Sequence, residues 1–382
     1  MRHIGIVAGE ASGDGLGASL IEGLRRRDPH IRISAMAGPR MLAAGCEPLA
    51  HIDELSVMGL VEVIRHYPRL RRLRHKLIET FAAAELDAFV SIDVPDFSLE
   101  ISRVLKTTGV PAVHLVCPQV WAWRQGRIPA LRRALDRMLV LFPFEVGFLA
   151  QHGIAADCIG HPLAEQLPLE PDRASARERL GLAGAAPVLA LMPGSRGQEY
   201  RRHLPLFLAA AAHLRQQRPG LRILVGAVHA TAAAAARALV PTGSPEIEII
   251  TGRASEVLTA ADVALCVSGT VTLEAALCQT PLVVAYRMPW LSYQVLRRLV
   301  RVDRIALPNL LMPAADIPEL VQAEASAERL AAALGDWLDT PARVAAYRAQ
   351  CADLHQTLRR GAGDAAAEAI LALIAARRVD SA

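Results

Sequence analysis

The stretch HIGIVAGEASGDGLG at residues 3–17 decides the fold. Its first six residues, His3 to Ala8, are mostly apolar and predict a short buried strand. The glycines that follow, from Gly9 to Gly17, predict a tight turn into a helix that continues to Arg27. A strand joined to a helix by a glycine-rich turn is the start of a βαβ unit, and such a turn can bring its backbone close to a ligand.

The same alternation of short apolar runs and longer amphipathic stretches continues along the chain. In the first half we expect further strands at Ile31–Met36, Ala88–Ile92, Ala112–Val116, Arg137–Leu141 and Asp157–Ile159, with helices such as Leu16–Arg27 and Leu70–Ala84 between them. In the second half we expect strands at Val188–Leu191, Arg222–Val225, Glu246–Ile250, Val263–Val267 and Leu282–Ala285, then helices at Ala327–Leu338, Pro341–Arg359 and Asp364–Arg377. Buried strands that alternate with helices predict parallel sheets.

The length of 382 residues exceeds what one hydrophobic core usually supports. The stretch from Pro162 to Asp172 is proline-rich and acidic, and we expect it to be a linker because the strand pattern starts again after it. The predicted fold class is α/β, with two doubly wound Rossmann-like domains facing a cleft. We expect the first domain at residues 1–165 and the second at residues 166–345. Residues 346–382 are expected to form helices that pack back on the first domain or on a partner subunit.

The composition argues against several classes of protein. A net charge of +4 is too small to indicate binding to nucleic acid. The six cysteines lack metal-ligand spacing and are typical of buried, reduced residues in a cytosolic protein. The start of the chain does not resemble a signal peptide, and no apolar run is long enough to span a bilayer. Any membrane contact is therefore expected to be peripheral.

Polar and glycine-rich clusters directly follow most of the predicted strands. They begin at Gly9, Asp93, Cys117, Pro143, Gly160, Pro193 and Ser268. Because open parallel sheets bind ligands at the carboxyl ends of their strands, these clusters predict one functional edge on each sheet.

Two carboxylates are candidates for chemistry in the first half. Asp93 follows a buried strand, where partial desolvation raises the pKa of a carboxyl group toward that of a general base. We expect Pro95 to keep Val94 extended and Asp96 to be an ordinary helix cap. Glu10, in the glycine-rich turn, is suited to orient a sugar hydroxyl or a base, and a purely structural turn is the alternative.

Two turns in the second half predict anion sites, because small residues leave backbone N–H groups accessible at a helix start. Arg196 adds a bidentate donor suited to a diphosphate. Glu274, one turn into the second of these helices, is suited to a ribose hydroxyl, with an ordinary first-turn acid as the alternative. The small residues of the two turns are Gly194, Ser195, Ser268, Gly269 and Thr270.

Two basic amphipathic stretches, Leu60–Phe81 and Trp290–Arg304, mix arginines with leucines and aromatic residues. Such stretches suit an anionic membrane surface, and a solvated helix face is the alternative. The histidines form no metal-ligand pattern, and the chain has no DxD pair to hold a metal-bound diphosphate. We therefore expect neither a metal nor a cofactor.

Ordered motifs along nearly the whole chain resemble the lipid-A-disaccharide synthase family. They are GEASGDGLG (9–17), AGPRM (37–41), SVMGLVEV (56–63), SIDVPDF (91–97), VWAWR (120–124), FPFE (142–145), GHP (160–162), MPGSRGQE (192–199), SGTVTLE (268–274), VVAYRM (283–288) and ALPNLL (306–311). Three positions depart from the family pattern. Ser98 stands where Asn is usual, Cys117-Pro118-Gln119 replaces Ser-Pro-Ser, and Met192 replaces a Leu.

The resemblance implies a GT-B-like fold and an inverting, metal-independent glycosyl transfer in lipid A (lipopolysaccharide) biosynthesis. The donor would be UDP-2,3-diacylglucosamine and the acceptor 2,3-diacylglucosamine 1-phosphate, called lipid X. The products would be UDP and the β-1,6-linked lipid A disaccharide 1-phosphate. The resemblance also implies a Gram-negative source and a cytoplasmic enzyme held peripherally on the cytoplasmic face of the inner membrane. Its partners would be the two lipid substrates, that membrane surface and, as one option, a second copy in a homodimer.

The resemblance assigns roles to particular residues. Asp93 would be the base, with Glu10, Arg196 and Asn309 as further catalytic residues. The substrate- or UDP-binding residues would be Gly9, Ser12, Gly13, Met58, Gly194, Ser195, Arg196, Ser268, Gly269, Thr270, Glu274 and Arg287.

Four other functions fit parts of the pattern. A UDP-N-acetylglucosamine epimerase or a peptidoglycan-precursor transferase would share the nucleotide side, but would not need acyl grooves. A non-catalytic UDP-binding scaffold on the membrane would keep the anion sites without needing Asp93. A Rossmann dehydrogenase is disfavoured, because the first turn lacks GxGxxG and no acidic residue ends the second strand.

Overall fold

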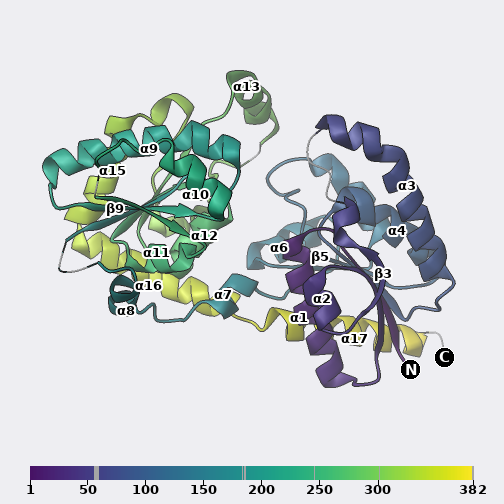
Figure 1. The fold of residues 1–382 in the computed structure, drawn as a ribbon. Helices are drawn as coiled ribbons and strands as arrows, with labels where there is room; N and C mark the ends of the chain where they lie inside the picture. The colour runs from purple at the N-terminus through teal and green to yellow at the C-terminus, as the bar shows by residue number, and fades with distance from the viewer. Residues whose placement is uncertain (56–59, 183, 185, 245, 301, 381–382) are drawn as a thin grey trace. The chain divides into compact units, whose positions relative to one another are not determined.

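The computed structural model describes residues 1–55, 60–182, 184, 186–244, 246–300 and 302–380. The chain divides into two compact units. The first unit comprises Met1–Glu165 and Leu358–Ala382, and the second comprises Gln166–Thr357. Each unit is built around one sheet with helices on both of its faces (Figure 1).

In its described residues, the first unit holds a seven-stranded parallel sheet in the order β3-β2-β1-β4-β5-β6-β7. The strands are β1 (His3–Ala8), β2 (Arg32–Ala37), β3 (Glu47–His51), β4 (Ala88–Ile92), β5 (Ala112–Leu115), β6 (Arg137–Val140) and β7 (Ala156–Cys158). The helices are α1 (Ala11–Arg27), α2 (Pro39–Ala43), α3 (Leu60–Ala82), α4 (Pro95–Thr107), α5 (Ile128–Ala134), α6 (Pro143–Gln151), α7 (Pro162–Gln166) and α17 (Ala362–Asp380), with short 3-10 turns η1 (Ile52–Leu55) and η2 (Gln125–Arg127).

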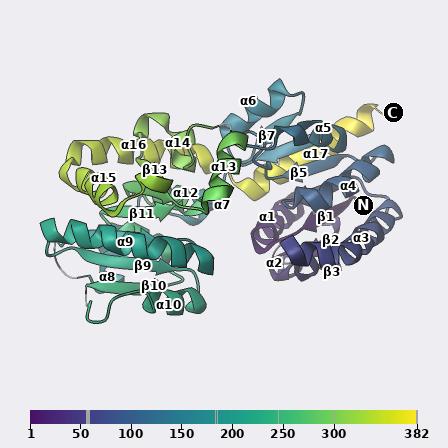
Figure 2. The ribbon, with the colours of Figure 1, turned by 90° about the horizontal axis from the view of Figure 1, so that it is seen from above.

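The second unit, as far as it is described, holds a six-stranded parallel sheet in the order β10-β9-β8-β11-β12-β13. The strands are β8 (Val188–Met192), β9 (Arg222–Ala227), β10 (Ile247–Thr251), β11 (Val263–Val267), β12 (Leu282–Tyr286) and β13 (Glu319–Val321). The helices are α8 (Arg173–Arg179), α9 (Gly197–Gln217), α10 (Ala230–Arg237), α11 (Ala254–Ala260), α12 (Thr270–Leu277), α13 (Trp290–Leu299), α14 (Leu307–Leu311), α15 (Ala327–Asp339) and α16 (Pro341–Leu358), with 3-10 turns η3 (Pro313–Ala315) and η4 (Gln322–Glu324). Figure 2 shows α9 and α15 side by side along this sheet.

Apolar side chains from strands and helices form the cores. In the first unit, α3 and α4 pack on β1, β2 and β4 through a buried cluster that includes Val7, Met36, Phe81, Phe89 and Ile101. Strands that are buried on both faces contain near-continuous apolar runs, which is why β1 and β4 are readily predicted from sequence.

The C-terminal helix α17 packs against α1 of the first unit (Figure 1). A Cβ atom at Gly23 would lie 2.6 Å from the carbonyl oxygen of Gly363, so glycine allows the two helices to approach closely. Asp364 forms ion pairs with Arg26 and Arg27 beside this contact. The expected boundary at residue 346 is wrong, because it falls inside the continuous helix α16 and the division lies at Leu358.

The expected elements differ from the structure in a few places. The expected linker begins with the short helix α7, and α1 starts at Ala11 rather than Leu16. Strands β3 and β13 are absent from the sequence-based expectation. Both lie at sheet edges and are only partly buried, so neither shows a clear apolar run.

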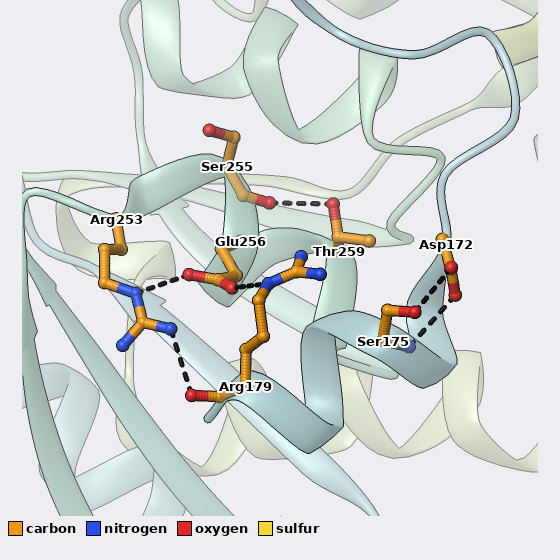
Figure 3. Close-up of polar contacts among 7 residues, drawn as sticks. All are labelled: Asp172, Ser175, Arg179, Arg253, Ser255, Glu256 and Thr259. Atoms are coloured by element: carbon orange, nitrogen blue, oxygen red, sulfur yellow. Dashed lines mark hydrogen bonds and ion pairs between the residues drawn. The ribbon is translucent and has the colours of Figure 1, made fainter. Parts of the chain in front are cut away.

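An ion-pair cluster joins α8 to α11 in the second unit (Figure 3). The carboxylate of Glu256 accepts hydrogen bonds from the guanidinium groups of Arg179 and Arg253, and Arg253 also donates to the backbone oxygen of Arg179. The cluster holds the start of α11, where the neighbouring residue Ala254 lines a pocket.

Candidate functional site

In both sheets, the direction in which successive strands are added reverses at an equivalent place. The strand order runs outward from the β1–β4 pair in the first unit and from the β8–β11 pair in the second. In open sheets of this kind, ligands bind at the carboxyl ends of these two central strands. Glu10 follows β1 and Asp93 follows β4, while Ser195 follows β8 and Ser268 follows β11. Four of the predicted clusters, which begin at Gly9, Asp93, Pro193 and Ser268, therefore lie at the switch points of the two sheets.

The loop that carries Asp93 has a strained backbone. The φ angles of Asp93 and Val94 are 56° and 44°, both in the left-handed region that favours glycine. The expectation that Pro95 keeps Val94 extended is therefore wrong. The physical reason lies at Gly9, where a Cβ atom would lie 2.9 Å from Cβ of Val94 and closer still to its methyl groups. The bare glycine leaves the space that this loop conformation needs.

Buried hydrogen bonds hold the same loop. The hydroxyl group of Ser98 is buried and donates to the backbone oxygens of Asp93 (3.3 Å) and Val94 (3.1 Å). The backbone N–H of Asp93 donates to the oxygen of Leu115 at 3.2 Å. A strained conformation persists only where the surrounding contacts over-determine it. Ser98 therefore positions the loop of Asp93.

Burial and a neighbouring charge both act on Asp93. Desolvation raises the pKa of its carboxyl group above the ordinary value, and the negative charge of Glu10 raises it further. Glu10 itself is exposed. A pair of carboxylates in which one has a raised pKa is suited to general base chemistry.

A second carboxylate of the glycine-rich stretch, that of Asp14, has a structural role. Asp14 is buried, and its oxygens accept hydrogen bonds from three backbone N–H groups at the start of α2. The donors are Gly38 (2.9 Å), Arg40 (2.9 Å) and Met41 (3.0 Å). Asp14 thus fixes the turn after β2 to the turn after β1.

Three further residues were predicted to bind substrate in the first unit. Ser12 is exposed in the first turn of α1, whereas Gly13 is buried against Ile92. Met58 lies outside the described residues.

The second unit contains a pocket of about 410 Å³ at its switch point. Its volume falls in the range of roughly 300–1,000 Å³ that is typical of small-molecule sites. Seven residues predicted from the sequence line it: Gly194, Ser195, Arg196, Ser268, Gly269, Thr270 and Glu274. It is also lined by residues that were not predicted to bind a ligand, namely Met192, Glu199, Gly226, Ala227, Val228, Ala254, Val267, Val271 and Tyr286.

The first expected anion site is already occupied by a side chain of the protein. The carboxylate of Glu199 accepts hydrogen bonds from the backbone N–H groups of Ser195 (2.8 Å) and Arg196 (3.1 Å). Gly194 has a φ of 122°, and a Cβ atom there would lie 2.6 Å from Cβ of Glu199. The spacing of a capping box, with an acid three residues after Arg196, is the signal that could have revealed this contact.

Glu274 lies in the same pocket and is partly buried. Burial raises the pKa of its carboxyl group, and a hydrogen bond from the side chain of Ser255 opposes that rise. At the rim, Arg196 is exposed. The pocket thus offers a cation and helix-start N–H groups for an anion, and a carboxylate for hydroxyl groups.

Two predicted residues of the second unit do not line this pocket. The guanidinium group of Arg287 donates to the backbone oxygen of Ala325 at 2.7 Å. Asn309 is buried, and its amide group exchanges hydrogen bonds with the backbone of Ile317 and donates to Glu319 at 2.6 Å. In these contacts Asn309 holds the segment before β13.

A buried carboxyl group lies after β6 in the first unit. Glu145 accepts hydrogen bonds from the indole N–H of Trp121 (3.0 Å) and the backbone N–H of Phe142 (3.0 Å). Burial raises its pKa to about 7, and these hydrogen bonds oppose the rise. His161 stacks on Phe142, and burial lowers the pKa of its imidazole to about 4, so it is neutral at pH 7.

The two basic amphipathic stretches form helices. From Tyr67 onward, the described side chains of α3, together with Glu100 of α4, line a groove of about 720 Å³ whose basic residues are Arg71, Arg72, Arg74, His75 and Lys76. On α13, no residue is buried, and four large apolar side chains are exposed: Trp290, Leu291, Val295 and Leu299. None of the helices in the described ranges has the length and apolar character needed to cross a membrane. In the same ranges, no group of three or more His, Cys, Asp and Glu residues could hold a metal ion.

Comparison with known proteins connects this geometry to a family. The family model described as lipid-A-disaccharide synthetase matches residues 4–373. The chain is 47% identical over 374 residues to the lipid-A-disaccharide synthase of Alkalilimnicola ehrlichii, covering 97% of this chain and 98% of the relative. It is 44% identical over 374 residues to the synthase of Chromohalobacter salexigens, covering 97% of each chain.

A solved structure shares the fold at low identity. Phytolacca americana UGT2, complexed with UDP-2-fluoro-glucose and pterostilbene, aligns with 99% of this chain and 99% of its own length, with a TM-score of 0.64 and 13% identity. This likeness and the two parallel sheets confirm the expected α/β class of GT-B type. With a family model and close relatives that span nearly its whole length, the chain belongs to the lipid-A-disaccharide synthetase family.

Proposed function

We propose that this protein transfers the 2,3-diacylglucosamine unit of UDP-2,3-diacylglucosamine to the 6-hydroxyl group of 2,3-diacylglucosamine 1-phosphate. The products are the β-1,6-linked disaccharide 1-phosphate and UDP. The family makes the chain a hexosyltransferase of lipid A disaccharide synthesis. The observation that carries the proposal is the pocket at the second switch point, because it gathers seven of the residues predicted to bind the donor.

The chemistry of that pocket suits the UDP part of the donor. The start of α12, at Gly269 and Thr270, offers backbone N–H groups to the diphosphate. Arg196 stabilises the charge that develops on UDP as the bond to the sugar breaks. Glu274 accepts hydrogen bonds from ribose hydroxyl groups. UGT2, of similar fold, is complexed with a UDP-sugar analogue, which supports a UDP-sugar as ligand here.

Asp93 is the proposed base of the acceptor side. Its carboxylate takes the proton of the acceptor 6-hydroxyl as that oxygen bonds to the anomeric carbon and the carbon–oxygen bond to UDP breaks. The electron pair of the broken bond leaves with UDP, so attack from the opposite face inverts an α-linked donor to a β-linked product. A raised pKa and a rigid loop suit a group that must accept a proton in one orientation.

Three other predicted residues receive supporting roles. Glu10 orients the acceptor beside Asp93 and raises the pKa of the base. Asn309 and Arg287 act as positioning residues, because their side chains hold the segments around β13 and Ala325.

A membrane surface is the proposed source of both substrates, since each carries acyl chains. The basic groove of α3 and the exposed apolar residues of α13 suit the anionic, cytoplasmic face of the inner membrane. Sedimentation with vesicles tests this part. Binding to anionic vesicles and weak binding to neutral ones is expected, with Leu291→Ser/Val295→Ser reducing the bound fraction.

Each alternative function leaves one observation unexplained. An epimerase or a peptidoglycan-precursor transferase does not account for the identity of 44–47% to lipid-A-disaccharide synthases over nearly the whole chain. A non-catalytic scaffold does not account for the strained, over-determined loop at Asp93.

Incubation with both lipid substrates in detergent micelles, without divalent metal, tests the reaction by mass spectrometry of UDP and disaccharide. The isosteric variant Asp93→Asn should lower kcat by about 10²- to 10⁴-fold, as loss of a general base usually does. Asp53→Asn, a change at an exposed carboxylate of the same unit, is the matched control and should retain activity.

Each result has a definite meaning. Disaccharide from the wild type and little from Asp93→Asn supports both the reaction and the base. Equal rates for the two proteins discard Asp93 as the base and keep the reaction. Binding of UDP without any disaccharide contradicts the proposed reaction.

A further inference from the structure

We propose that a small cavity beside the Asp93 loop binds the 1-phosphate group of the acceptor; this inference rests on the function proposed above. The cavity has a volume of about 160 Å³ and is called the Arg124 cavity here. It is lined by Pro118, Gln119, Val120, Trp123, Arg124 and Arg127. Its volume is well below the roughly 300–1,000 Å³ of pockets that enclose a whole ligand, so it suits one group of a larger substrate.

The Arg124 cavity is joined to the loop of the proposed base from two sides. Strand β5 ends at Leu115, whose oxygen accepts the backbone N–H of Asp93 at 3.2 Å, and the cavity lining begins three residues later at Pro118. On the other side, Arg127 forms an ion pair with Asp96. Asp96, which was expected to cap α4, lies instead in its first turn, three residues after Asp93.

Arg124 is arranged to receive an anion. Its side chain is exposed, its guanidinium carbon lies 4.2 Å from the ring centroid of Trp123, and it forms no ion pair with any described residue. Stacking on an aromatic face restrains the planar group and leaves its N–H edge available, which suits bidentate binding of a phosphate. The backbone of Arg124 has a φ of 56°, in the left-handed region that few residues other than glycine adopt, at the position just before η2.

Arg127 can contribute the second cation. Its partner Asp96 is 79% exposed, and an ion pair at such an exposed carboxylate is weak. A phosphate monoester carries close to two negative charges at pH 7 and offers three acceptor oxygens, so it competes well with a single exposed carboxylate. The two guanidinium groups together favour a phosphate over a neutral hydroxyl group.

The chemistry of the acceptor explains why such a site is useful. The acceptor has its attacking hydroxyl at carbon 6 and its phosphate at carbon 1 of the same sugar ring. A phosphate held beside the Asp93 loop fixes one end of the ring, so the 6-hydroxyl is oriented toward the base. The Arg124 cavity therefore selects acceptors with a phosphate at carbon 1.

Measuring several variants with two acceptors tests whether the cavity selects for the phosphate. Steady-state rates are measured with 2,3-diacylglucosamine 1-phosphate and with the same lipid lacking phosphate. The wild type should prefer the phosphorylated acceptor in kcat/KM. Arg124→Ala should lose about 10- to 100-fold of that preference, the usual effect of removing a hydrogen bond to a charged group, and should leave kcat/KM for the unphosphorylated acceptor nearly unchanged. Arg127→Ala should act in the same direction, and Arg124→Lys should restore part of the preference.

Arg133→Ala is the matched control, because it removes an exposed arginine of the neighbouring helix α5 that does not line the cavity. A direct measurement complements the kinetics. Binding of glucosamine 1-phosphate, which lacks acyl chains, is followed by calorimetry and should weaken at least tenfold in Arg124→Ala but not in Arg133→Ala.

Several outcomes would overturn the inference while keeping the proposed function. Equal losses in Arg124→Ala for both acceptors would assign Arg124 to folding or to the sugar ring. If Arg124→Ala raised only the KM for the UDP-sugar, the cavity would bind the donor and not the acceptor. If the wild type makes no disaccharide at all, the proposed function fails, and the glucosamine 1-phosphate titration still decides whether the Arg124 cavity binds a sugar phosphate.

Discussion

Val94 fills the space left by the missing side chain of Gly9, because a Cβ atom at Gly9 would lie 2.9 Å from Cβ of Val94. Gly9 precedes Glu10 and Val94 follows Asp93, so this contact controls how the two carboxylates are spaced. It joins two strand-end loops that are 85 residues apart in the chain.

Gly9→Ala should displace Val94 and disturb the loop of the base. We expect a loss in kcat of at least about tenfold, together with an overpacking cost of roughly 1–3 kcal/mol in the free energy of unfolding. The double variant Gly9→Ala/Val94→Ala should recover part of the lost kcat and part of the lost stability, since it removes the overlapping methyl groups. Kinetics and urea denaturation of the three proteins measure these effects, and a double variant no better than Gly9→Ala would contradict the steric explanation.

Glu10→Gln should shift the pH profile of kcat/KM. A base acts when deprotonated, so activity rises with pH through the pKa of Asp93, which burial and the charge of Glu10 hold above the ordinary value. Removing that charge lowers the pKa, and the acidic limb of the profile should move to lower pH whatever happens to the maximal rate. Asp53→Asn should leave the limb in place. A limb that stays unchanged in Glu10→Gln would mean that the two groups are not coupled in solution.

Glu199→Gln should strengthen the binding of UDP severalfold. The carboxylate of Glu199 takes the two N–H groups of Ser195 and Arg196 that an anion would use, and its charge repels a diphosphate. The same change should cost about 1 kcal/mol of stability, because a capping interaction is weakened. Calorimetry with UDP measures the affinity, and Glu170→Gln, at an exposed acid outside the pocket, is the control. Weaker UDP binding in Glu199→Gln would show instead that this carboxylate orders the loop for the ligand.

Glu145 should make the stability of the protein depend on pH. Its pKa is raised from 4.5 to about 7 in the folded state, so between these values the folded protein holds a proton that the unfolded chain has released. This contribution is fully present below about pH 4.5 and is lost as the pH rises through about 7. The difference in unfolding free energy between wild type and Glu145→Gln should therefore change by up to about 3 kcal/mol from pH 5 to pH 8.

Comparing the wild type with Glu145→Gln isolates the contribution of the Glu145 carboxyl group. Burial lowers the pKa of His114 to about 4, which gives the opposite slope, with stability lost as the pH falls through that value. Both proteins retain His114, so its effect cancels in the difference. A flat difference between the two proteins would contradict the raised pKa of Glu145.

Much of the fold can be predicted from local sequence. The central strands β1, β4, β8 and β11 are short apolar runs buried on both faces, and their positions follow from the local pattern of apolar and turn residues. Strands β7 and β10, each at one sheet edge, were also predicted, but β3 and β13 at the opposite edges could not be predicted in this way. They bury little surface, and their pairing depends on neighbours that are distant in the chain.

The candidate site was likewise predictable only in part. The polar clusters that follow the central strands were predictable, because parallel strands bring their carboxyl ends to one edge. The orientation of individual side chains was not. The resemblance predicted a catalytic role for Asn309, whereas in the structure its amide group is buried and bonded to Ile317 and Glu319.

By itself, the sequence determined the α/β class, the central strands and the residue types available at each sheet edge, since these depend on hydrophobic periodicity and on local turn chemistry. Only the tertiary structure decided which groups meet. The left-handed backbone at Asp93 depends on space beside Gly9, and α17 depends on α1 for its partner. Glu199 reaches the N–H groups at the start of α9 only because Gly194 has no side chain. Each of these is a contact whose energy depends on the relative position of two segments, and local sequence does not specify that position.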